Sequence, residues 1–344
     1  MMDKIIAYFS VSALFIFITL IISIFFTKIY ICLAKKLGFF SVPHQGGVRQ
    51  DIIPTSGGIA FGLTYLLMLL LLAAFIELPE NYFLSIIFGS GFMLLTGFID
   101  DIHSLSSSIR LVIQLLFVTV ICFLFDVQSS FNSNLDYFFV LPIIIFGSIW
   151  IINTFNFIDG ADGLVATNSI IFSLVGAIYL LLSENQILAT LLLMLSAVNL
   201  GFLFFNWSPA KIFMGDSGSL FLGSVFVIFL LGSYIESPIT YWTWIILLSI
   251  FYIETTVTLF VRIKRQENFL SVHHSHHAYQ QIIITSGEHN RPALISIFIN
   301  ILWVIPMSSL SFIYPEYGAF IAVVTCLPLS FLFYFFGPYQ TKIN

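Results

Sequence analysis

Long apolar segments alternate with short polar ones along the whole chain. Eleven segments rich in Leu, Ile, Phe and Val approach the ~20 residues that cross a bilayer. Each is predicted to be a helix, because hydrocarbon leaves no backbone polar group able to hydrogen-bond outside its own segment. The pattern predicts an all-α, polytopic membrane protein with one domain over residues 1–344 and no internal repeat. The predicted spans cover residues 5–32, 57–76, 82–99, 109–125, 137–152, 164–183, 186–205, 219–235, 240–261, 292–313 and 317–336.

Composition supports this class. The 344 residues are 59% hydrophobic and 8% charged, with a mean hydropathy of +1.04, whereas soluble domains carry about 25% charged residues. A water-soluble protein is therefore excluded, and no basic cluster indicates a nucleic-acid partner. The 3 cysteines are odd in number and lie in apolar runs, so no disulfide framework is expected. The first apolar segment is too long for a signal-peptide core and is predicted to be a retained span.

Lysine and arginine predict the orientation. Of the 12 basic residues, all but Lys4 lie in the loops after predicted spans 1, 3, 5, 7 and 9, at the span ends beside those loops, or in the C-terminal tail. Positively charged loops stay in the cytoplasm. The N-terminus is thus expected outside and the C-terminus inside. All the polar motifs described below then lie on the cytoplasmic face.

The most polar motif is Asn153-Thr-Phe-Asn156-Phe-Ile-Asp159-Gly-Ala-Asp162-Gly, between two apolar runs. Its amides and carboxylates recur every third residue, so on a helix they would face roughly one way. Such a stripe is costly beside a membrane unless a charged ligand lies against it. A divalent cation with a phosphorylated ligand would fit. The alternative is a loop of ordinary cap and turn residues.

Two further motifs carry carboxylates. Asp100 and Asp101 are adjacent at the end of a span and would point about 100° apart on a helix. One could bind a metal while the other handles a proton; the alternative is a pair of helix-end acids. Asp216 lies in Gly-Asp-Ser-Gly-Ser just before the next predicted span. That turn is typical of a phosphate-binding helix N-terminus with an oxygen ligand for Mg²⁺, or of a plain N-cap.

The longest loop carries a histidine cluster, and the span before it carries an acid. His273, His274, His276 and His277 could donate protons or contact phosphate near neutral pH. Zinc fits less well than Mg²⁺ because the other candidate ligands are carboxylates and amides. Glu254 is the one acid well inside a span, where acids are functional candidates. It could equally pair with a neighbouring helix near Arg262, so it is left outside the predicted site.

From Pro54 to Gln280 these ordered motifs resemble the polyprenyl-phosphate N-acetylhexosamine-1-phosphate transferase family. The resemblance implies a Mg²⁺-dependent phosphotransferase, with Mn²⁺ as an alternative ion. Such an enzyme moves a sugar 1-phosphate from a UDP-sugar to undecaprenyl phosphate and releases UMP. It works at the cytoplasmic face of the bacterial inner membrane, and a homodimer is conceivable.

The resemblance also assigns roles to single residues. Asp100 and Asp101 match the family's aspartate pair, proposed as base or nucleophile near the metal. Asp216 matches the principal Mg²⁺ ligand, and Asp159 a residue near the metal and pyrophosphate. His274 and His277 fit the family's histidine motif best and are expected to be catalytic, as is Asp159. The expected substrate contacts are Asn153, Asn156, Asp162, Asn206, Lys211, Phe213, His273 and His276.

The histidine stretch favours one branch of the family. It reads His-His-Ser-His-His-Ala-Tyr-Gln, similar to the enzymes that start lipid-linked glycans such as the lipopolysaccharide O-antigen. The phospho-N-acetylmuramoyl-pentapeptide transferase branch of cell-wall synthesis usually carries a triple histidine followed by Phe-Glu. Ser56 stands where glycan-branch members often have a basic residue, which Arg49 could supply. A divalent-cation or proton transporter and a non-catalytic scaffold remain rival functions, although transporters place their ligands near the midplane.

Overall fold

The computed structural model describes residues 2–41, 52–131, 133–233, 239–266 and 277–337. Within these ranges the regular structure is helical and no strand is present, so the predicted all-α class is confirmed. An isolated antiparallel bridge pairs Phe40 with Pro54. It brings the segment after the first helix back to the start of the second.

The helices follow the apolar segments of the sequence closely, with short 3₁₀ and π segments at several joints. The α-helices are α1 Met2–Leu37, α2 Gly58–Ala73, α3 Glu80–Leu84, α4 Gly91–His103, α5 Ser107–Leu124, α6 Asn134–Ile158, α7 Leu164–Leu182, α8 Gln186–Asn206, α9 Gly215–Gly232, α10 Tyr241–Leu247, α11 Ser249–Lys264, α12 Ala278–Ser286, α13 Arg291–Ile299, α14 Ile305–Ile313 and α15 Gly318–Phe336. The π segments are η1 Ser85–Ser90 and η3 Asn300–Val304, and the 3₁₀ turns are η2 Val127–Ser130 and η4 Pro315–Tyr317.

The predicted number of spans, eleven, is not confirmed. In the described ranges nine helical runs are long and apolar enough to cross a bilayer. The segment predicted at 240–261 is a pair of helices, α10 and α11, bent by 66°. The segment predicted at 57–76 is α2, which has 16 residues. Each of these helices is therefore shorter than the ~20 residues that a full span needs.

Helix α9 is the centre of the bundle, with 89% of its residues buried. Glycines let its neighbours approach it at backbone distance. A Cβ on Gly58 of α2 would lie 2.0 Å from the Gly218 nitrogen, and one on Gly97 of α4 would lie 2.2 Å from the Asp216 carbonyl oxygen. Small residues allow this close packing between membrane helices, where apolar burial alone gives no preference for helix over lipid. The three helices are thereby fixed beside the Asp216 motif.

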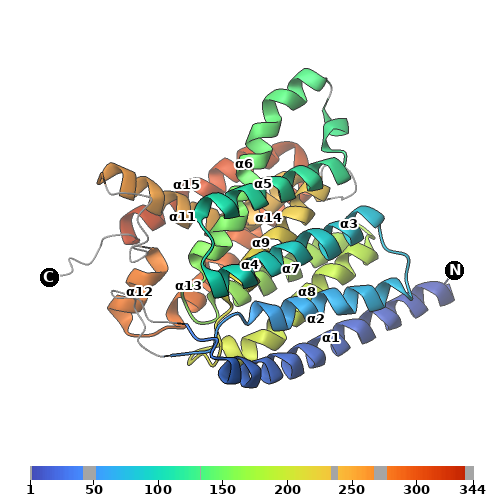
Figure 1. Ribbon diagram of the computed structural model, residues 1–344. Helices are drawn as coiled ribbons and strands as arrows, with labels where there is room; N and C mark the ends of the chain where they lie inside the picture. The colour runs from blue at the N-terminus through green and yellow to red at the C-terminus, as the bar shows by residue number, and fades with distance from the viewer. Residues whose placement is uncertain (1, 42–51, 132, 234–238, 267–276, 338–344) are drawn as a thin grey trace.

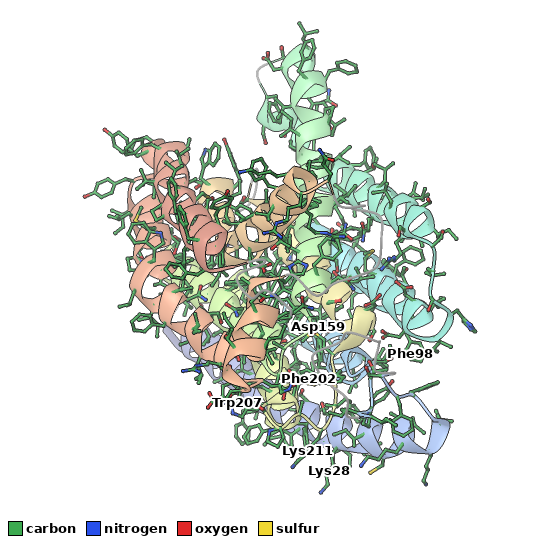
Figure 2. All side chains as sticks on the ribbon, turned by 90° about the vertical axis from the view of Figure 1, so that its left-hand side faces the viewer. Lys28, Phe98, Asp159, Phe202, Trp207 and Lys211 are labelled. Carbon is green, nitrogen blue, oxygen red and sulfur yellow. The ribbon has the colours of Figure 1, made fainter. Side chains whose placement is uncertain are left out.

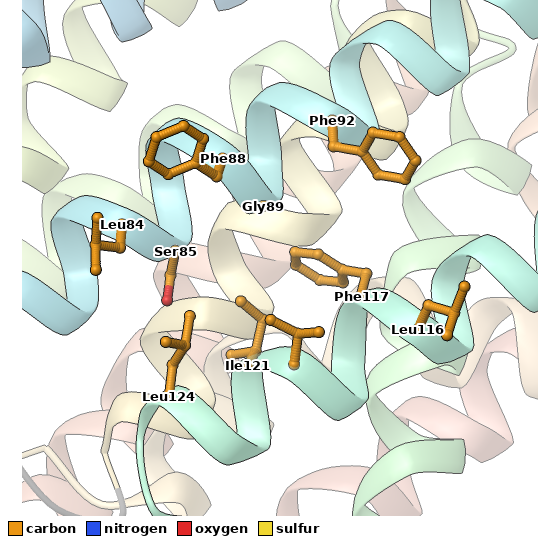
Figure 3. Close-up of a pocket in the computed structure, with 10 residues that line it drawn as sticks. Leu84, Ser85, Phe88, Gly89, Phe92, Leu116, Phe117, Ile121 and Leu124 are labelled. Atoms are coloured by element: carbon orange, nitrogen blue, oxygen red, sulfur yellow. The ribbon is translucent and has the colours of Figure 1, made fainter.

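The outer helices expose apolar faces. Only 28% of α5 and 22% of the α6 span are buried, and the start of α6 stands away from the bundle (Figure 1). A groove of about 380 Å³ lies between η1–α4 and α5 (Figure 3). Its lining is apolar apart from Ser85: Leu84, Ser85, Phe88, Gly89, Phe92, Leu116, Phe117, Val120, Ile121 and Leu124.

The polar motifs gather at one end of the bundle. The C-terminal ends of α1 and α4 and the whole of α12 lie at the lower left of Figure 1, opposite the N-terminus. Seen from that side, Asp159 lies near the middle, with Trp207 and Lys211 below it (Figure 2). The sequence motifs are thus neighbours in space, as an interfacial site requires.

Candidate functional site

Asp101 caps the N-terminus of the central helix from a neighbouring helix. Its Oδ1 accepts the Asp216 backbone N–H at 2.8 Å, and its Oδ2 accepts that of Ser217 at 3.2 Å. A helix N-terminus leaves its first N–H groups unpaired and favours a negative charge there. The turn that the sequence suggests for a phosphate therefore already holds a carboxylate of the protein itself. Ser56 also hydrogen-bonds this carboxylate.

Asp100 points into a different environment. Its Oδ1 accepts the Leu105 backbone N–H at 2.6 Å, and its Oδ2 lies 3.2 Å from Arg110 Nη1. The same Arg110 nitrogen lies 3.6 Å from Asp216 Oδ2. Arg110 therefore bridges carboxylates from α4 and α9. The adjacent aspartates do diverge, as predicted, and only Asp100 shares a cation with Asp216.

Asp216 lies in the first turn of α9, not before the helix as the sequence boundary suggested. The helix begins early because Gly215, at φ +74°, allows the chain to turn directly into it. Asn156 Nδ2 donates to Asp216 Oδ1 at 2.7 Å and to Ser219 Oγ at 3.2 Å. Asn156 thus orients the carboxylate, and a third of the Asp216 side chain remains exposed.

Asp159 follows α6 directly and is partly buried. Burial and the nearby charge of Asp101 raise the pKa of Asp159 to about 7, although a hydrogen bond from the Gly215 backbone acts in the opposite direction. The hydrogen bond with Gly215 brings Asp159 beside the start of α9. A carboxylate with so unfavourable an environment for its charge is a candidate for binding a cation.

The predicted one-sided stripe is wrong in its geometry. Helix α6 continues through Asn153 and Asn156 but ends at Ile158, so helical spacing no longer applies to Asp162. Asn153 forms a reciprocal amide pair with Gln114 of α5, at 3.1 and 2.8 Å. Asp162 is 1% exposed, and its Oδ2 accepts the Ala210 backbone N–H at 3.1 Å. The polar residues of the motif therefore diverge toward different elements.

The segment between α8 and α9 is tied to the turn after α6. Asn206 accepts the Gly163 N–H at 3.1 Å and donates to the Ile212 carbonyl at 3.0 Å. Phe213 is half-buried, and its backbone pairs with Pro54 and Gly57 over 2.8 and 2.9 Å. Lys211 is exposed. Of these predicted substrate contacts, Phe213 and Lys211 keep accessible side chains, whereas Asn206 is buried and shapes the loop.

The histidine motif is placed only in part. His273, His274 and His276 lie outside the described residues. His277 is 7% exposed, and its Nδ1 lies 2.9 Å from Glu254 Oε2 on α11. Glu254 therefore joins α11 to a neighbouring helix, since it contacts His277 and Ala278 at the start of α12.

The side chains at this end offer suitable donor atoms for Mg²⁺, but they are not already arranged around one point. Asp100, Asp159 and Asp216 offer the carboxylate oxygens that Mg²⁺ prefers. In the part of the chain that the structure describes, no three Asp, Glu, His or Cys side chains converge on one point. The Asp100 Oδ2 atom is buried and accepts no hydrogen bond from a described residue, so its charge is balanced by Arg110. A cation bound between Asp100 and Asp216 would take over that balancing charge.

Three residues outside the predicted set belong to this end: Arg110, Gln114 and Glu254. Arg110 is the fourth residue of α5, and Gln114 is buried one turn later. Charged or amide side chains inside apolar segments are costly without partners. That rule singled out Glu254 and applies equally to Gln114. The groove of Figure 3 contains none of the polar site residues.

Known proteins resemble this chain along most of its length. Residues 83–234 match the profile of glycosyl transferase family 4. A probable undecaprenyl-phosphate N-acetylglucosaminyl 1-phosphate transferase of Bacillus subtilis is 29% identical over 303 residues, which is 83% of this chain and 81% of the relative. The phospho-N-acetylmuramoyl-pentapeptide-transferase of Staphylococcus haemolyticus is 30% identical over 234 residues, 61% of this chain and 72% of the relative.

A second transferase of that name, from Prochlorococcus marinus, is 31% identical over 230 residues. The match covers 59% of this chain and 63% of the relative, so it spans less than two thirds of that protein. The residues that match the family profile include both the Asp100–Asp101 pair and the Asp216 motif. The chain is a polytopic membrane protein of glycosyl transferase family 4, the family of polyprenyl-phosphate N-acetylhexosamine-1-phosphate transferases.

Proposed function

We propose that the protein transfers an N-acetylhexosamine 1-phosphate from a UDP-sugar to undecaprenyl phosphate and releases UMP. The observation that carries the proposal is the meeting of Asp100 and Asp216 on one arginine, with Asp101 and Asp159 beside the same helix start. Phosphoryl transfer needs positioned groups and balanced charge more than covalent chemistry by the protein. This end of the bundle supplies both.

The two adjacent aspartates have different roles in this proposal. Both oxygens of Asp101 accept backbone N–H groups, so Asp101 holds the start of α9 in place. The Oδ2 atom of Asp100 is held by no backbone N–H of a described residue; it lies 3.2 Å from Arg110 Nη1 and faces Asp216 across that arginine. Asp100 is therefore the better general base. It would take the proton of the lipid phosphate as that oxygen attacks the sugar-bearing phosphorus and the bond to UMP breaks.

Asp216, Asp100 and Asp159 are the residues that would hold Mg²⁺ or Mn²⁺. When bound, the ion would neutralise negative charge on the pyrophosphate. Asn156 keeps the Asp216 carboxylate oriented toward that position. Attack by an aspartate on phosphorus, giving a phospho-enzyme, is the alternative route, and Asp100 is the better-placed nucleophile for it.

The donor nucleotide would lie against the segment between α8 and α9. Half-buried Phe213 can stack on uracil, and the exposed Lys211 can attract the anionic donor. Asp162 and Asn206 act on the nucleotide by fixing this segment to the turn after α6. Asn153 contributes by joining α6 to α5 through Gln114. The remaining proposed contacts, for phosphate or lipid, are His273, His274, His276 and His277.

The proposed location is the inner membrane of a bacterium, with this end of the bundle at the cytoplasmic face. The distribution of lysine and arginine supports that orientation. An N-acetylglucosamine-type donor is favoured, because the Bacillus subtilis relative matches 303 residues and the muramoyl-pentapeptide relatives match about 230. The product would then start a lipid-linked surface glycan, of which O-antigen is one example. A homodimer is part of the same proposal.

The test is a transfer assay with purified protein, undecaprenyl phosphate, Mg²⁺ and a panel of UDP-sugars. We expect UMP release and a lipid-linked sugar with one donor of the N-acetylhexosamine type, dependent on both lipid and metal. Use of UDP-N-acetylmuramoyl-pentapeptide alone would assign the protein to the cell-wall branch. Folded protein without product from any donor would contradict the transferase and favour the transporter, which ion-flux measurements in vesicles would then test.

A further inference from the structure

We propose that Glu254 is a positioning residue for His277: it fixes the ring so that Nδ1 carries the proton and Nε2 is the unprotonated nitrogen. The same carboxylate fixes the first residue of α12. The proposal deepens the proposed function, since His277 is useful to the transfer only if the transferase assignment is right. The geometry itself does not depend on that assignment.

The contact between the two residues is short and buried. His277 Nδ1 lies 2.9 Å from Glu254 Oε2, and the Ala278 N–H donates to Glu254 Oε1 at 2.6 Å. Glu254 is 4% exposed and His277 is 7% exposed. Both carboxylate oxygens are thus used as acceptors. Because an ionised carboxylate only accepts, we assign the proton to the ring nitrogen at 2.9 Å.

The surroundings strengthen the contact. A small cavity of about 50 Å³ beside Glu254 is lined mainly by apolar side chains, including Ile250 and Phe251 of the same helix. In such a low-dielectric environment a charge-assisted hydrogen bond is strong, and a carboxylate without its donors would be costly. The pair therefore links the bent α10–α11 segment to the start of α12.

The ring of His277 is also confined by its neighbours. It stacks on Tyr279 with centroids 5.6 Å apart and faces Phe157 at 6.5 Å. The Tyr279 hydroxyl donates to the Phe157 carbonyl at 3.2 Å, and a Cβ on Gly160 would lie 2.3 Å from that hydroxyl oxygen. Tyr279 thus sits directly on the turn that carries Asp159. Glu254 places His277 and, through α12, this tyrosine beside the proposed active site.

A fixed tautomer has a chemical consequence. With Nδ1–H donated to Glu254, neutral His277 keeps Nε2 as its acceptor or base nitrogen. For metal-bound histidines, removal of the partner that orients the ring through its second nitrogen costs about 10–100-fold in metal affinity or activity, and we expect an effect of this order here. Glu254 would therefore matter to turnover without touching substrate.

The first test is the protonation pattern of the ring in the purified full-length protein. The protein is labelled with ¹⁵N-histidine, and the His277 signals are assigned by their loss in His277→Gln. We expect neutral His277 to be protonated at Nδ1 in the wild type. In Glu254→Gln an amide offers one acceptor and one donor where two acceptors are used, so the Nε2-protonated form should gain population. An unchanged tautomer, or a wild-type ring protonated at Nε2, would overturn the proposal.

The second test is a double-mutant cycle on transfer rate, with Glu254→Gln, His277→Gln and both changes together. We expect Glu254→Gln to lower kcat about 10–100-fold and to have little further effect once His277 is absent. Independent, multiplying losses would show that Glu254 acts by another route and would refute the positioning role. Thr255→Val is the matched control, because Thr255 is buried on the same helix and its hydroxyl donates to the Phe251 carbonyl one turn earlier.

The two tests separate the proposals. A wild type without transferase activity but with the predicted ring tautomer would remove the proposed function and leave the Glu254–His277 contact intact. An active wild type whose tautomer does not respond to Glu254→Gln would remove this inference alone. Thermal unfolding of each variant identifies any loss of rate that comes from loss of fold.

Discussion

The carboxylate of Asp101 accepts the backbone N–H of Asp216 at 2.8 Å, although 115 residues separate them. This bond gives the aspartate pair a structural role in addition to the chemical role proposed for it. One member holds the start of the central helix, and the other faces the acid on that helix across Arg110. The residue that binds the helix end and the residue proposed as the general base are thus neighbours in sequence.

Replacement of Asp101 should cost stability as well as rate. Asp101→Ala leaves two N–H groups at the start of α9 without their acceptor, which costs about 1–3 kcal/mol for groups shielded from water. Asp101→Asn keeps one acceptor and should lose less. Thermal unfolding in detergent measures both. Asp136→Asn, in the first turn of α6, is the control; equal unfolding temperatures for Asp101→Ala and this control would contradict the capping role.

Removal of the proposed metal ligands should abolish most turnover with little loss of fold. We expect Asp216→Asn and Asp100→Asn each to slow UMP release at least ~100-fold, the scale of losses in acid–base catalysis. Chelation of the wild type should stop the reaction, and added Mg²⁺ should restore it. The Mg²⁺ concentration that gives half of the maximal rate should also be higher for Asp216→Asn than for the wild type. Near-normal turnover in this variant would exclude Asp216 as a ligand.

A methyl group at Gly97 should disrupt the site from within the bundle. A Cβ there would lie 2.2 Å from the Asp216 carbonyl oxygen and 2.5 Å from the Ser217 nitrogen. Gly97→Ala must therefore push α4 from α9, at a cost of about 1–3 kcal/mol for overpacking. Gly147→Ala is the matched control, since a Cβ at that position would meet no atom within 4 Å. If both variants unfold at the same temperature and react at the same rate, the close crossing is not needed.

Asn153 and Gln114 should behave as one unit in stability measurements. Their side chains exchange two hydrogen bonds between α5 and α6, at 3.1 and 2.8 Å. In a double-mutant cycle with alanine at each position, we expect a coupling of about 0.5–3 kcal/mol. A direct substrate contact by Asn153 would instead raise the KM of Asn153→Ala far above that of Gln114→Ala. Equal KM values for the two variants would support the structural pairing.

The pattern of apolar and polar residues along the chain predicted the helices well. The apolar runs predicted their positions, because burial in lipid requires both apolar side chains and a self-satisfied backbone. It was a poor guide to helix ends, since Asn153 and Asn156 are polar yet helical. Their polar partners, Gln114 and Asp216, lie on other helices, and no periodicity in a single segment reveals them.

The sequence by itself determined the membrane class, the family and the residue types of the site, because these depend on composition and on short motifs. Only the tertiary structure determined which partners each of those residues contacts. It placed Asp101 on the backbone of α9, Asp100 and Asp216 on Arg110, and His277 on Glu254. The physical reason is that a carboxylate or imidazole takes its role from the donors and charges around it. In this fold those partners come from helices far apart in the chain.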